Sequence, residues 1–412
     1  MTAPAAPAPA TERTEQTERT AHAEQTEPSE PSEPSEPLVI FGDASIRYDF
    51  GPQHPLTPRR FGPGIDLLRS TGARRFRDPA QASDAELGRL HDAAYLDVVV
   101  RFSGDPDIRP QAGIGPGDCP PFADMHRVSA TVAGGSITAM DAILSGDALR
   151  AVHPGGGLHH AMAGHASGFC IYNDVALAVA RARDAGNRVL YVDLDVHHGD
   201  GVQALFWDDP EVLTYSIHET GLSLFPGTGF VDEAGGLDAR GTAVNVPLEP
   251  YSGDRSWLEA LRLTLPPLAA AFGPDILVSQ HGCDSHLYDP LAHLRVTTAA
   301  YWAADTLLDE ISRRHTGGRW LATGGGGYDA YRVVPRAWSL VWLAQAGLRP
   351  PESLPTDWID RWTDEADAYG QAPLPQRYLD PGDIVAGDPP SRFDDNRRTA
   401  ERALTAALER LS

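Results

Sequence analysis

The 412-residue sequence contains no lysine, because all 34 of its basic residues are arginine. This absence excludes a catalytic lysine that forms a Schiff base with its substrate, and it excludes the lysine of a nucleotide-binding P-loop. It also leaves no lysine side chain that could be acetylated or otherwise modified. Codon bias from a GC-rich genome is a sufficient explanation, since Ala, Gly, Pro and Arg are abundant.

Cysteines and long apolar runs are also scarce. The three cysteines, Cys119, Cys170 and Cys283, are far apart and form no CxxC pair, so neither a disulfide framework nor a thiolate zinc site is indicated. No apolar run reaches the roughly 18 residues of a membrane-spanning helix, and the N-terminus has neither the basic start nor the apolar core of a secretory signal. A cytoplasmic protein with no membrane partner fits these absences.

Basic residues are fewer than acidic ones, 34 against 57, which gives a formal net charge of −23 at pH 7. Such a surface repels the phosphate backbone of DNA and RNA, which argues against a nucleic-acid partner. The same charge favours solubility and could attract cationic substrates.

Residues 1–37 form an acidic, low-complexity segment, in which TERTEQTERT is followed by TEPSEPSEPSEP. This segment cannot bury enough apolar surface to offset the entropy lost on ordering, so we predict a disordered tail. A globular pattern begins at Leu38. We expect a single domain over 38–349 and a C-terminal extension over 350–412 that is rich in Pro and Asp and ends in a helix.

Strand-like and helix-like segments alternate within the expected domain. The predicted strands are 38–43, 149–154, 188–195, 212–218, 275–282 and 319–327. The predicted helices are 172–186, 256–272, 297–315 and 331–347, with the last helix at 396–411. This alternation predicts an α/β fold with a central, mostly parallel sheet flanked by helices. Ligand-binding groups of such sheets gather at the carboxyl ends of the strands, which is where each polar cluster of this sequence falls.

One polar cluster ends the strand that contains LYVDLDVHHGDG, residues 190–201. Residues i, i+2 and i+4 of an extended strand point to one side, so Asp193, Asp195 and His197 are predicted to face one site. Buried carboxylates are unfavourable unless they are paired or bind a metal, and these ligand types suit zinc, iron(II) or manganese. An ion-pair network or a structural cation site is the alternative.

Histidines and a further aspartate follow two other strands. PGGGLHH, residues 154–160, ends in the pair His159–His160, which could divide acid and base work because imidazole titrates near neutral pH. SQHGCDSHLYDPL, residues 279–291, contains Asp284, which can complete a metal site with two aspartates and one histidine. His281 or His286 could instead be the ligand.

The fourth cluster is TGGGGYDAYR, residues 323–332. Four glycines predict a flexible turn or a phosphate-binding loop, and the absence of lysine weakens the second interpretation. Tyr328 directly follows the glycines and could donate a hydrogen bond to an oxyanion.

These clusters, in this order, resemble the arginase-like histone deacetylase family over roughly residues 38–347. YDFGPQHPLTPRR is similar to the family's amino-terminal HPxxP stretch, and HHAMAGHASGFCIYND, YVDLDVHHGDGV, FPGTG and GGGGY are jointly very specific. QHGCDSHLYDPLAHL looks closest to the bacterial branch called acetoin-utilisation deacetylases. The resemblance implies a single-domain arginase/deacetylase-like fold with its active site at the carboxyl ends of the strands.

The resemblance also implies the roles of the residues that would perform the reaction. One catalytic divalent metal, Zn²⁺ in preference to Fe²⁺ or Mn²⁺, would be bound by Asp195, His197 and Asp284. His160 would be the general base, oriented by Asp200. His159 would stabilise charge beside it, oriented by Asp193. Tyr328 would bind the substrate carbonyl.

Two further sites are implied by the same resemblance. An acyl-lysine channel would be lined by Gly168, Phe169, Phe225 and Leu291. A structural monovalent cation, K⁺, would be bound by the side chains of Asp193 and Ser216 and by the backbone carbonyls of Asp195, His197 and Ile217.

The implied function is metal-dependent hydrolysis of N6-acetyl-lysine in proteins, with AMP-forming acetyl-CoA synthetase as one implied target in the bacterial branch. The alternative substrate is a small acetylated amine such as an acetylpolyamine, which an acidic channel mouth would favour. A catalytically dead acyl-lysine binder is disfavoured because every expected catalytic position is filled. A ureohydrolase with two manganese ions is disfavoured because only one convincing set of metal ligands is present.

One departure from the family pattern concerns the rim of the expected channel. Arg127, in GDCPPFADMHRVSA, stands about where the family has an acidic residue that contacts the substrate backbone. The grip on a peptide would then differ, although Asp124 could compensate.

Overall fold

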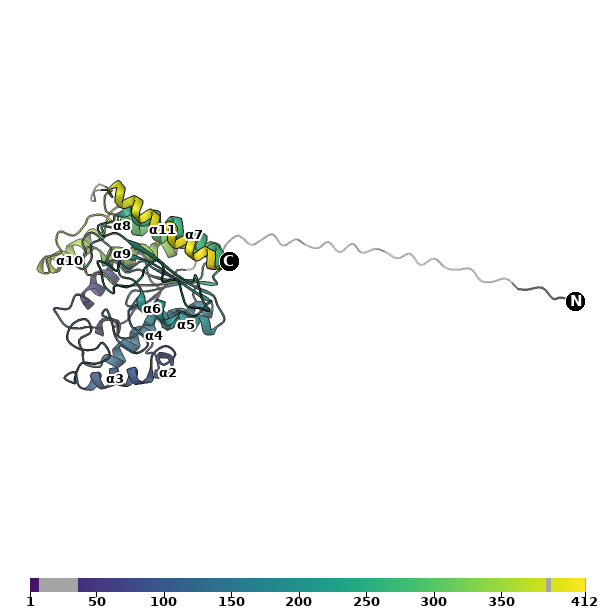
Figure 1. The fold of residues 1–412 in the computed structure, drawn as a ribbon, viewed down its shortest axis with the longest axis horizontal. Coiled ribbons are helices and arrows are strands. Elements are labelled where there is room, and N and C mark those ends of the chain that lie inside the picture. Colours follow the sequence, from purple (N-terminus) through teal and green to yellow (C-terminus); the bar gives the residue numbers. More distant parts are fainter. Residues whose placement is uncertain (7–35, 383–386, 412) are drawn as a thin grey trace. The chain divides into compact units, whose positions relative to one another are not determined.

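The structure, a computed structural model, describes residues 1–6, 36–382 and 387–411. The chain divides into two units, Met1–Pro34 and Ser35–Ser412, and the second contains every helix and strand of the described part (Figure 1). Of the predicted disordered tail, residues 1–37, the segment 7–35 lies outside the described residues. The tail stays a prediction, as do the domain bounds 38–349 and 350–412.

Eight strands form a single sheet in the order β2-β1-β3-β8-β7-β4-β5-β6. Each strand runs parallel to its neighbours. The strands are β1 (Leu38–Ile40), β2 (Phe76–Arg77), β3 (Arg150–His153), β4 (Val189–Asp193), β5 (Val212–Glu219), β6 (Ala243–Leu248), β7 (Ile276–Gln280) and β8 (Trp320–Thr323). The predicted α/β class with a central parallel sheet is confirmed.

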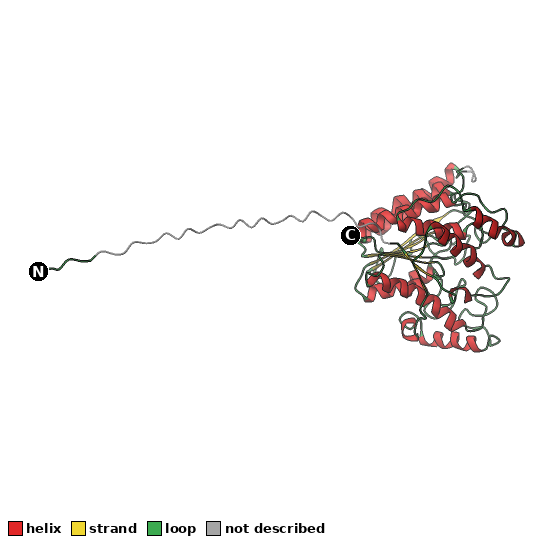
Figure 2. Ribbon diagram, turned by 180° about the vertical axis from the view of Figure 1, so that it is seen from behind, coloured by secondary structure: helices red, strands yellow, loops and turns green. Residues whose placement is uncertain are grey.

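Helices cover both faces of the sheet, and Figure 2 shows the strands between two helical layers. One side holds α2 (Asp84–Leu87), α3 (Ala93–Gly104), α4 (Met125–Leu144), α5 (Asp174–Asp184) and α6 (Asp200–Leu205). The other side holds α1 (Phe61–Thr71), α7 (Asp254–Phe272), α8 (Thr298–His315), α9 (Val334–Ala346), α10 (Thr356–Ala368) and α11 (Pro390–Leu411). Two short 3₁₀ helices, η1 (Ser45–Arg47) and η2 (Pro58–Arg60), precede α1.

The side chains of β4 alternate between the two cores, as expected for a strand that is buried on both faces. Val189 and Tyr191 pack in the cluster that contains apolar residues of α5. Leu190 and Val192 pack in the cluster that contains residues of α7 and α9. Asp193 ends the strand and is fully buried, so its carboxylate needs a partner inside the protein.

The ends of the central strands place polar residues in one row across the sheet. The register pairs are His153 with Thr323, Thr323 with Gln280, Gln280 with Asp193, and Asp193 with Ser216. All five residues are buried. The loops that follow these strands therefore begin at adjacent points of one edge, where ligand sites of parallel sheets form.

The predicted strands and helices all appear, with bounds that differ by several residues. The strand predicted over 188–195 ends at Asp193, and the one predicted over 319–327 ends at Thr323. Two edge strands, β2 and β6, were not predicted. β6 contains Pro247, which removes a backbone donor and is tolerated here because the strand lies at the edge of the sheet.

Several helices were also absent from the prediction, and α4 shows the reason. It contains the adjacent glycines Gly134 and Gly135, which lower helix propensity. A Cβ atom on Gly135 would lie 2.5 Å from the ring of His153, so the glycine lets α4 pack closely on β3. This tertiary packing outweighs the local propensity.

Among the described helices, none is both long and apolar enough to cross a lipid bilayer. Cys119, Cys170 and Cys283 are buried and free, in agreement with the predicted lack of a disulfide framework. Burial raises the pKa of the Cys119 thiol to about 12, so this thiol stays protonated at neutral pH.

We expect Gly64→Ala to destabilise the domain. A Cβ atom at this position of α1 would lie 2.5 Å from the ring of Trp338 on α9, which is fully buried and cannot move away freely. The overpacking should lower the free energy of unfolding by about 1–3 kcal/mol, measured by urea denaturation. Gly104→Ala at the end of α3 meets nothing within 4 Å and is the control, with unchanged or higher stability.

Candidate active site and metal centre

Four loops meet above the row of strand ends, after β3, β4, β7 and β8. Of the residues predicted as catalytic or metal-binding, Asp193 ends β4 itself. The others lie on these loops and at the start of α6, and they are His159, His160, Asp195, His197, Asp200, Asp284 and Tyr328. Segments more than a hundred residues apart in the sequence therefore contribute to one site.

The chain turns sharply after β4 and does not continue as a strand. The Asp193 carboxylate accepts a hydrogen bond from the backbone N–H of Asp195 at 3.1 Å, and the Asp195 carboxylate accepts one from the N–H of His197 at 3.0 Å. These short-range bonds replace the extended backbone that would have pointed three side chains the same way. Asp193 therefore has a different partner from Asp195 and His197, because its carboxylate binds His159, which lines the same cavity.

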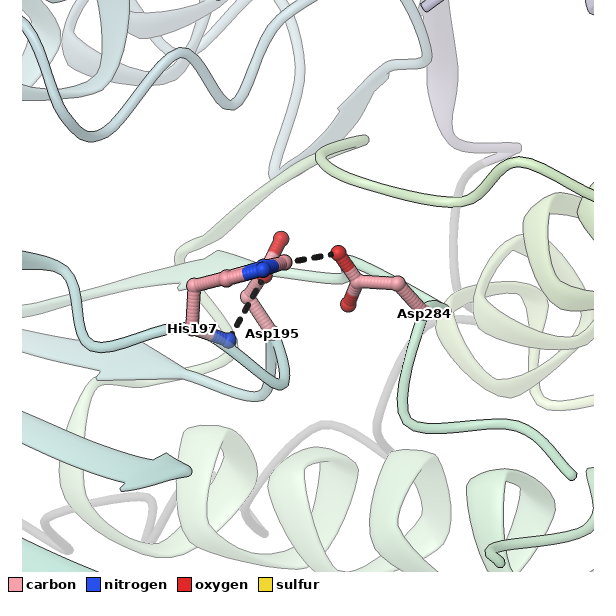
Figure 3. Close-up of side chains that lie close together, drawn as sticks. All are labelled: Asp195, His197 and Asp284. Atoms are coloured by element: carbon pink, nitrogen blue, oxygen red, sulfur yellow. Dashed lines mark hydrogen bonds and ion pairs between the residues drawn. The ribbon is translucent and has the colours of Figure 1, made fainter. Parts of the chain in front are cut away.

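Asp195, His197 and Asp284 form a compact, buried group that could hold a metal ion (Figure 3). Their candidate ligand atoms all lie within 4.8 Å of one another. The His197 Nδ1 atom is 3.1 Å from an oxygen of Asp195 and 3.1 Å from an oxygen of Asp284. Within the described part of the chain, this is the one such cluster of His, Cys, Asp and Glu side chains.

The spacing and chemistry of this group fit a divalent metal. Ligands about 2.0–2.1 Å from a tetrahedral zinc ion are separated by about 3.3 Å, close to the separations from His197 Nδ1. Burial and the charge of Asp195 raise the pKa of Asp284 to about 6, the direction expected for neighbouring buried carboxylates, and the same carboxylates raise the pKa of His197. A divalent cation would add positive charge beside these carboxylates.

The carboxylates are held in place by donors from neighbouring loops. Asp195 Oδ2 accepts hydrogen bonds from the Gln280 side chain at 2.7 Å and from the Gly326 N–H at 2.9 Å. Asp284 Oδ1 accepts one from the Val196 N–H at 2.9 Å. Gln280 was missed by the sequence analysis, although a polar residue at the end of a buried strand is the signal that could have identified it.

His159 and His160 are each bonded to one aspartate. His159 Nδ1 lies 2.7 Å from Asp193 Oδ2, and His160 Nδ1 lies 2.7 Å from Asp200 Oδ1. These pairings are the ones that the sequence analysis expected. Because Nδ1 of each ring faces a carboxylate, Nε2 is the nitrogen left for chemistry in the cavity.

The two adjacent histidines have opposite pKa shifts. Burial alone would lower the pKa of His159, but the charges of Asp193 and Asp195 outweigh it and raise the pKa to about 9. Burial lowers the pKa of His160 to about 4, and the positive charge of His159 adds to this effect. At neutral pH the pair therefore combines one imidazolium with one neutral imidazole, an arrangement that suits a division of acid and base roles.

The loop that carries the histidine pair is fixed by buried side chains that the sequence analysis did not identify. Asp174 accepts hydrogen bonds from the N–H groups of Gly157 and Leu158 at distances between 2.7 and 3.1 Å. Asn173 donates its side-chain N–H to the carbonyl oxygens of His159 and Ala161. Asn173 is the N-cap of α5 and Asp174 is its first residue, so the start of this helix holds the loop that carries the histidines.

A narrow cavity reaches this site and is lined by half of the predicted residues. Its walls are formed by Leu56, Gly157, Leu158, His159, His160, Gly168, Phe169, Cys170, Asp195, His197, Gly325, Gly326 and Tyr328. Phe225 lies beside the same histidines, with its ring centroid 5.0 Å from that of His160 and 6.3 Å from that of His197. Phe225 and Leu291 are partly exposed, at 41% and 37%, as residues at an entrance would be.

The wall around Phe169 depends on an unusual backbone conformation. Gly168 has φ 52° and Phe169 has φ 68°, in the left-handed region that a bulky residue rarely adopts. Tyr48 stabilises it, because its hydroxyl donates to the Phe169 carbonyl oxygen at 2.7 Å and accepts from the Ile171 N–H at 3.1 Å. A Cβ atom on Gly168 would lie 2.3 Å from the His160 ring, so this position requires glycine.

Tyr328 completes the wall opposite Phe169, and their ring centroids are 5.9 Å apart. Burial and the charges of Asp284 and Asp195 raise its pKa well above the usual value, so the phenol stays protonated and can donate. Its hydroxyl has no hydrogen-bond partner among the described residues.

His281 and His286, which the sequence left open as ligands, point elsewhere. His281 binds the Ser279 hydroxyl at 2.7 Å and Asp305 at 3.2 Å. His286 binds Asp380 at 2.9 Å and accepts from the Tyr288 N–H. The structure thus leaves His197 as the histidine of the candidate metal-binding group.

Arg127 and Asp124 pair with each other, at 2.6 Å on the exposed start of α4. Their predicted effect on a substrate at the rim stays a prediction. The potassium site also stays a prediction, although Asp193 and Ser216 do lie side by side as register partners on β4 and β5.

Comparison with known proteins gives three independent matches. The family described as Histone deacetylase domain matches residues 54–345. Acetoin utilization protein AcuC of Bacillus subtilis (strain 168) is 41% identical over 377 residues, which cover 89% of this chain and 96% of the relative. AcuC of Staphylococcus aureus (strain MRSA252) is 41% identical over 350 residues, covering 83% and 89%.

A solved structure agrees with these matches. The crystal structure of an HDAC homolog complexed with SAHA matches with a TM-score of 0.77 and 28% sequence identity, over 89% of this chain and 99% of that chain. The fold, the family match and the relatives all cover the loops that form the cavity. This chain therefore belongs to the histone deacetylase family and is related to the AcuC proteins of bacteria.

Proposed function

We propose that this protein hydrolyses N6-acetyl-lysine in cytoplasmic proteins. The observation that carries the proposal is one narrow cavity in which a candidate metal group, a carboxylate-bound histidine pair and an unpaired tyrosine hydroxyl meet. Hydrolysis of an amide needs a nucleophile, a proton donor for the leaving amine and a donor to the carbonyl oxygen. Each need has a suitable residue here.

His160 is the general base and acid of the proposed reaction. Its neutral Nε2 accepts a proton from the attacking water, whose oxygen forms a bond to the carbonyl carbon. The carbon–nitrogen bond then breaks, and the same proton passes to the departing lysine amine. Asp200 orients the ring through Nδ1, and the imidazolium of His159, oriented by Asp193, stabilises the negative charge that develops beside it.

Asp195, His197 and Asp284 would hold the catalytic metal, which we propose is Zn²⁺, with Fe²⁺ or Mn²⁺ as alternatives. When bound, such a metal acts as a Lewis acid that polarises the carbonyl and makes water more acidic. Tyr328 donates its hydroxyl to the carbonyl oxygen from the opposite wall. The structural K⁺ is proposed beneath this group, where Asp193 and Ser216 are register partners.

The channel explains the preference for an uncharged acyl tip on a long apolar stem. Phe169 and Phe225 flank the four-carbon chain of the lysine, with Gly168 and Leu291 beside them. An acetylated lysine is neutral and therefore enters without losing the hydration of an ammonium group. One protein substrate that we propose is AMP-forming acetyl-CoA synthetase, in keeping with the role in acetoin utilization for which the relatives are named.

A small acetylated amine is the second candidate, because the net charge of −23 would attract a cationic acetylpolyamine. We would assay the purified protein with an acetyl-lysine peptide and with N-acetylputrescine, after stripping metal and adding back zinc, iron(II) or manganese. We expect metal-dependent acetate release from the peptide. Activity on N-acetylputrescine alone would assign the enzyme to small amides, and inactivity on both with metal bound would contradict the enzymatic proposal.

Tyr328→Phe should retain the metal and lose most turnover. The change removes only the hydroxyl that is proposed to stabilise the oxyanion, and one such donor contributes roughly 3 kcal/mol, or about a hundredfold in kcat. Single-substrate kinetics with bound metal quantified in parallel would test this. Turnover equal to that of the unmodified protein would remove Tyr328 from the mechanism.

His160→Ala should be nearly inactive while folded and able to bind metal, because no other neutral imidazole of the described residues is placed to transfer the proton. The matched control is His165→Ala, which changes an exposed histidine of the same loop and should leave turnover unchanged. Both variants would be compared by kcat and by circular dichroism. A normal rate for His160→Ala would refute its assignment as the base.

A further inference from the structure

Residues beyond 345 lie outside the family match, yet they pack directly on the active-site loops. Ala330 and Tyr331, which follow the glycine run and Tyr328, share a buried apolar cluster with Trp358, Leu374 and Tyr378. The Tyr331 hydroxyl also donates to Glu365 of α10 at 2.8 Å. The C-terminal extension therefore forms the support of the loop that carries Tyr328.

Gln371 makes the most direct contact with that loop. Its side-chain N–H donates to the carbonyl oxygen of Tyr328 at 3.2 Å, and its side-chain oxygen accepts from the Tyr331 N–H at 3.1 Å. The N–H of Tyr328 donates to Asp289 at 3.0 Å. The backbone on both sides of the Tyr328 side chain is thus tethered, while Gly324–Gly327 before it have no side chains with which to fix the loop.

A second residue of the extension supports the loop of Asp284. Asp380 is buried and binds Nε2 of His286 at 2.9 Å. His286 lies two residues after Asp284, the candidate metal ligand. Arg336 of α9 forms an ion pair with the Asp380 carboxylate at 2.8 Å. The N–H and the hydroxyl of Thr298 both donate to the same carboxylate. Asp380 therefore joins the loop after β7 to two helices through one carboxylate.

We infer that the C-terminal extension completes the active site through two positioning residues. Gln371 sets the place of Tyr328, and Asp380, through His286, sets the place of Asp284. The first statement rests on the proposed hydrolysis, because Tyr328 matters there for turnover. The second concerns metal affinity and does not depend on which substrate is used. Because the two residues hold different loops, their loss should have different consequences.

Gln371→Glu tests the first contact with little change in shape. A carboxylate still accepts from the Tyr331 N–H but cannot donate to the carbonyl oxygen of Tyr328, whereas Gln371→Ala removes both contacts. We expect both variants to lower kcat about tenfold or more, with KM and the zinc Kd within about twofold of the unmodified protein. Gln376→Ala is the matched control, since Gln376 is an exposed residue of the same extension, and its kcat should not change.

His286→Asn tests the second contact without leaving a buried charge unpaired. Asparagine can still accept from the Tyr288 N–H but does not reach Asp380, and the Arg336–Asp380 ion pair remains. We expect the zinc Kd, measured by competition with a chromophoric chelator, to weaken about tenfold or more. Asp380→Asn should show the same direction, and urea denaturation would verify that each variant is folded at the assay temperature.

Binding of SAHA, the ligand of the similar solved structure, separates this inference from the proposed function because it requires no turnover. Weaker SAHA binding by Gln371→Glu at saturating zinc supports the positioning role even if no acetylated substrate is hydrolysed. An unchanged kcat and SAHA affinity in Gln371→Glu, or an unchanged zinc Kd in folded His286→Asn, would overturn the inference. Equal losses of kcat and zinc affinity in all variants, Gln376→Ala included, would overturn it as well.

Discussion

The structure depends on one electrostatic constraint, which is that Asp195 and Asp284 are buried side by side next to a single imidazole. Two such carboxylates repel each other strongly in a medium of low dielectric constant, and burial adds to the difficulty by removing their hydration. Burial and the charge of Asp195 raise the pKa of Asp284 accordingly. A bound divalent cation would relieve this repulsion, and the surrounding hydrogen bonds from Gln280, Gly326 and Val196 keep the oxygens aimed at one point.

The parallel sheet makes this arrangement feasible. Because β3, β8, β7 and β4 are neighbours, the loops that follow them start from one edge, although they are far apart in the sequence. Hydrogen bonds from side chains to nearby backbone N–H groups stabilise the turn after β4. The Asp193 carboxylate then binds His159 and is not part of the candidate metal-binding group. The neighbouring histidines His159 and His160 have opposite pKa shifts: the charges of Asp193 and Asp195 raise the pKa of His159, whereas burial and the charge of His159 lower that of His160. The different surroundings of these two imidazoles, and not their residue type, therefore distinguish their pKa values.

The end of the family match is not the end of the candidate site. The family match ends at residue 345, whereas Gln371 and Asp380 contact the loops that carry Tyr328 and Asp284. The final helix α11 likewise packs Ala400, Ala403 and Ala407 into the main core beside β6 and α7. An extension of this kind adds few chemical groups of its own. It restricts the loops that carry the chemistry, and such restriction is what holds catalytic groups within the small tolerance that transition-state stabilisation allows.

The sequence by itself determined the α/β class and the positions of the central strands, because strong apolar periodicity is a local signal. Its clustered ionisable residues identified candidate metal ligands but left His281 and His286 open as alternatives. It did not identify the helix α4, whose glycines are explained only by close packing on β3, nor the edge strand β6. The pairings of His159 with Asp193 and of His160 with Asp200 were expected from family resemblance and are visible in the structure. Only the tertiary structure decided that His281 and His286 bind Asp305 and Asp380, and that Gln280 and Gln371 support the site. The reason is physical: these contacts join residues far apart in the chain, and a hydrogen bond between distant residues leaves no local pattern in the sequence.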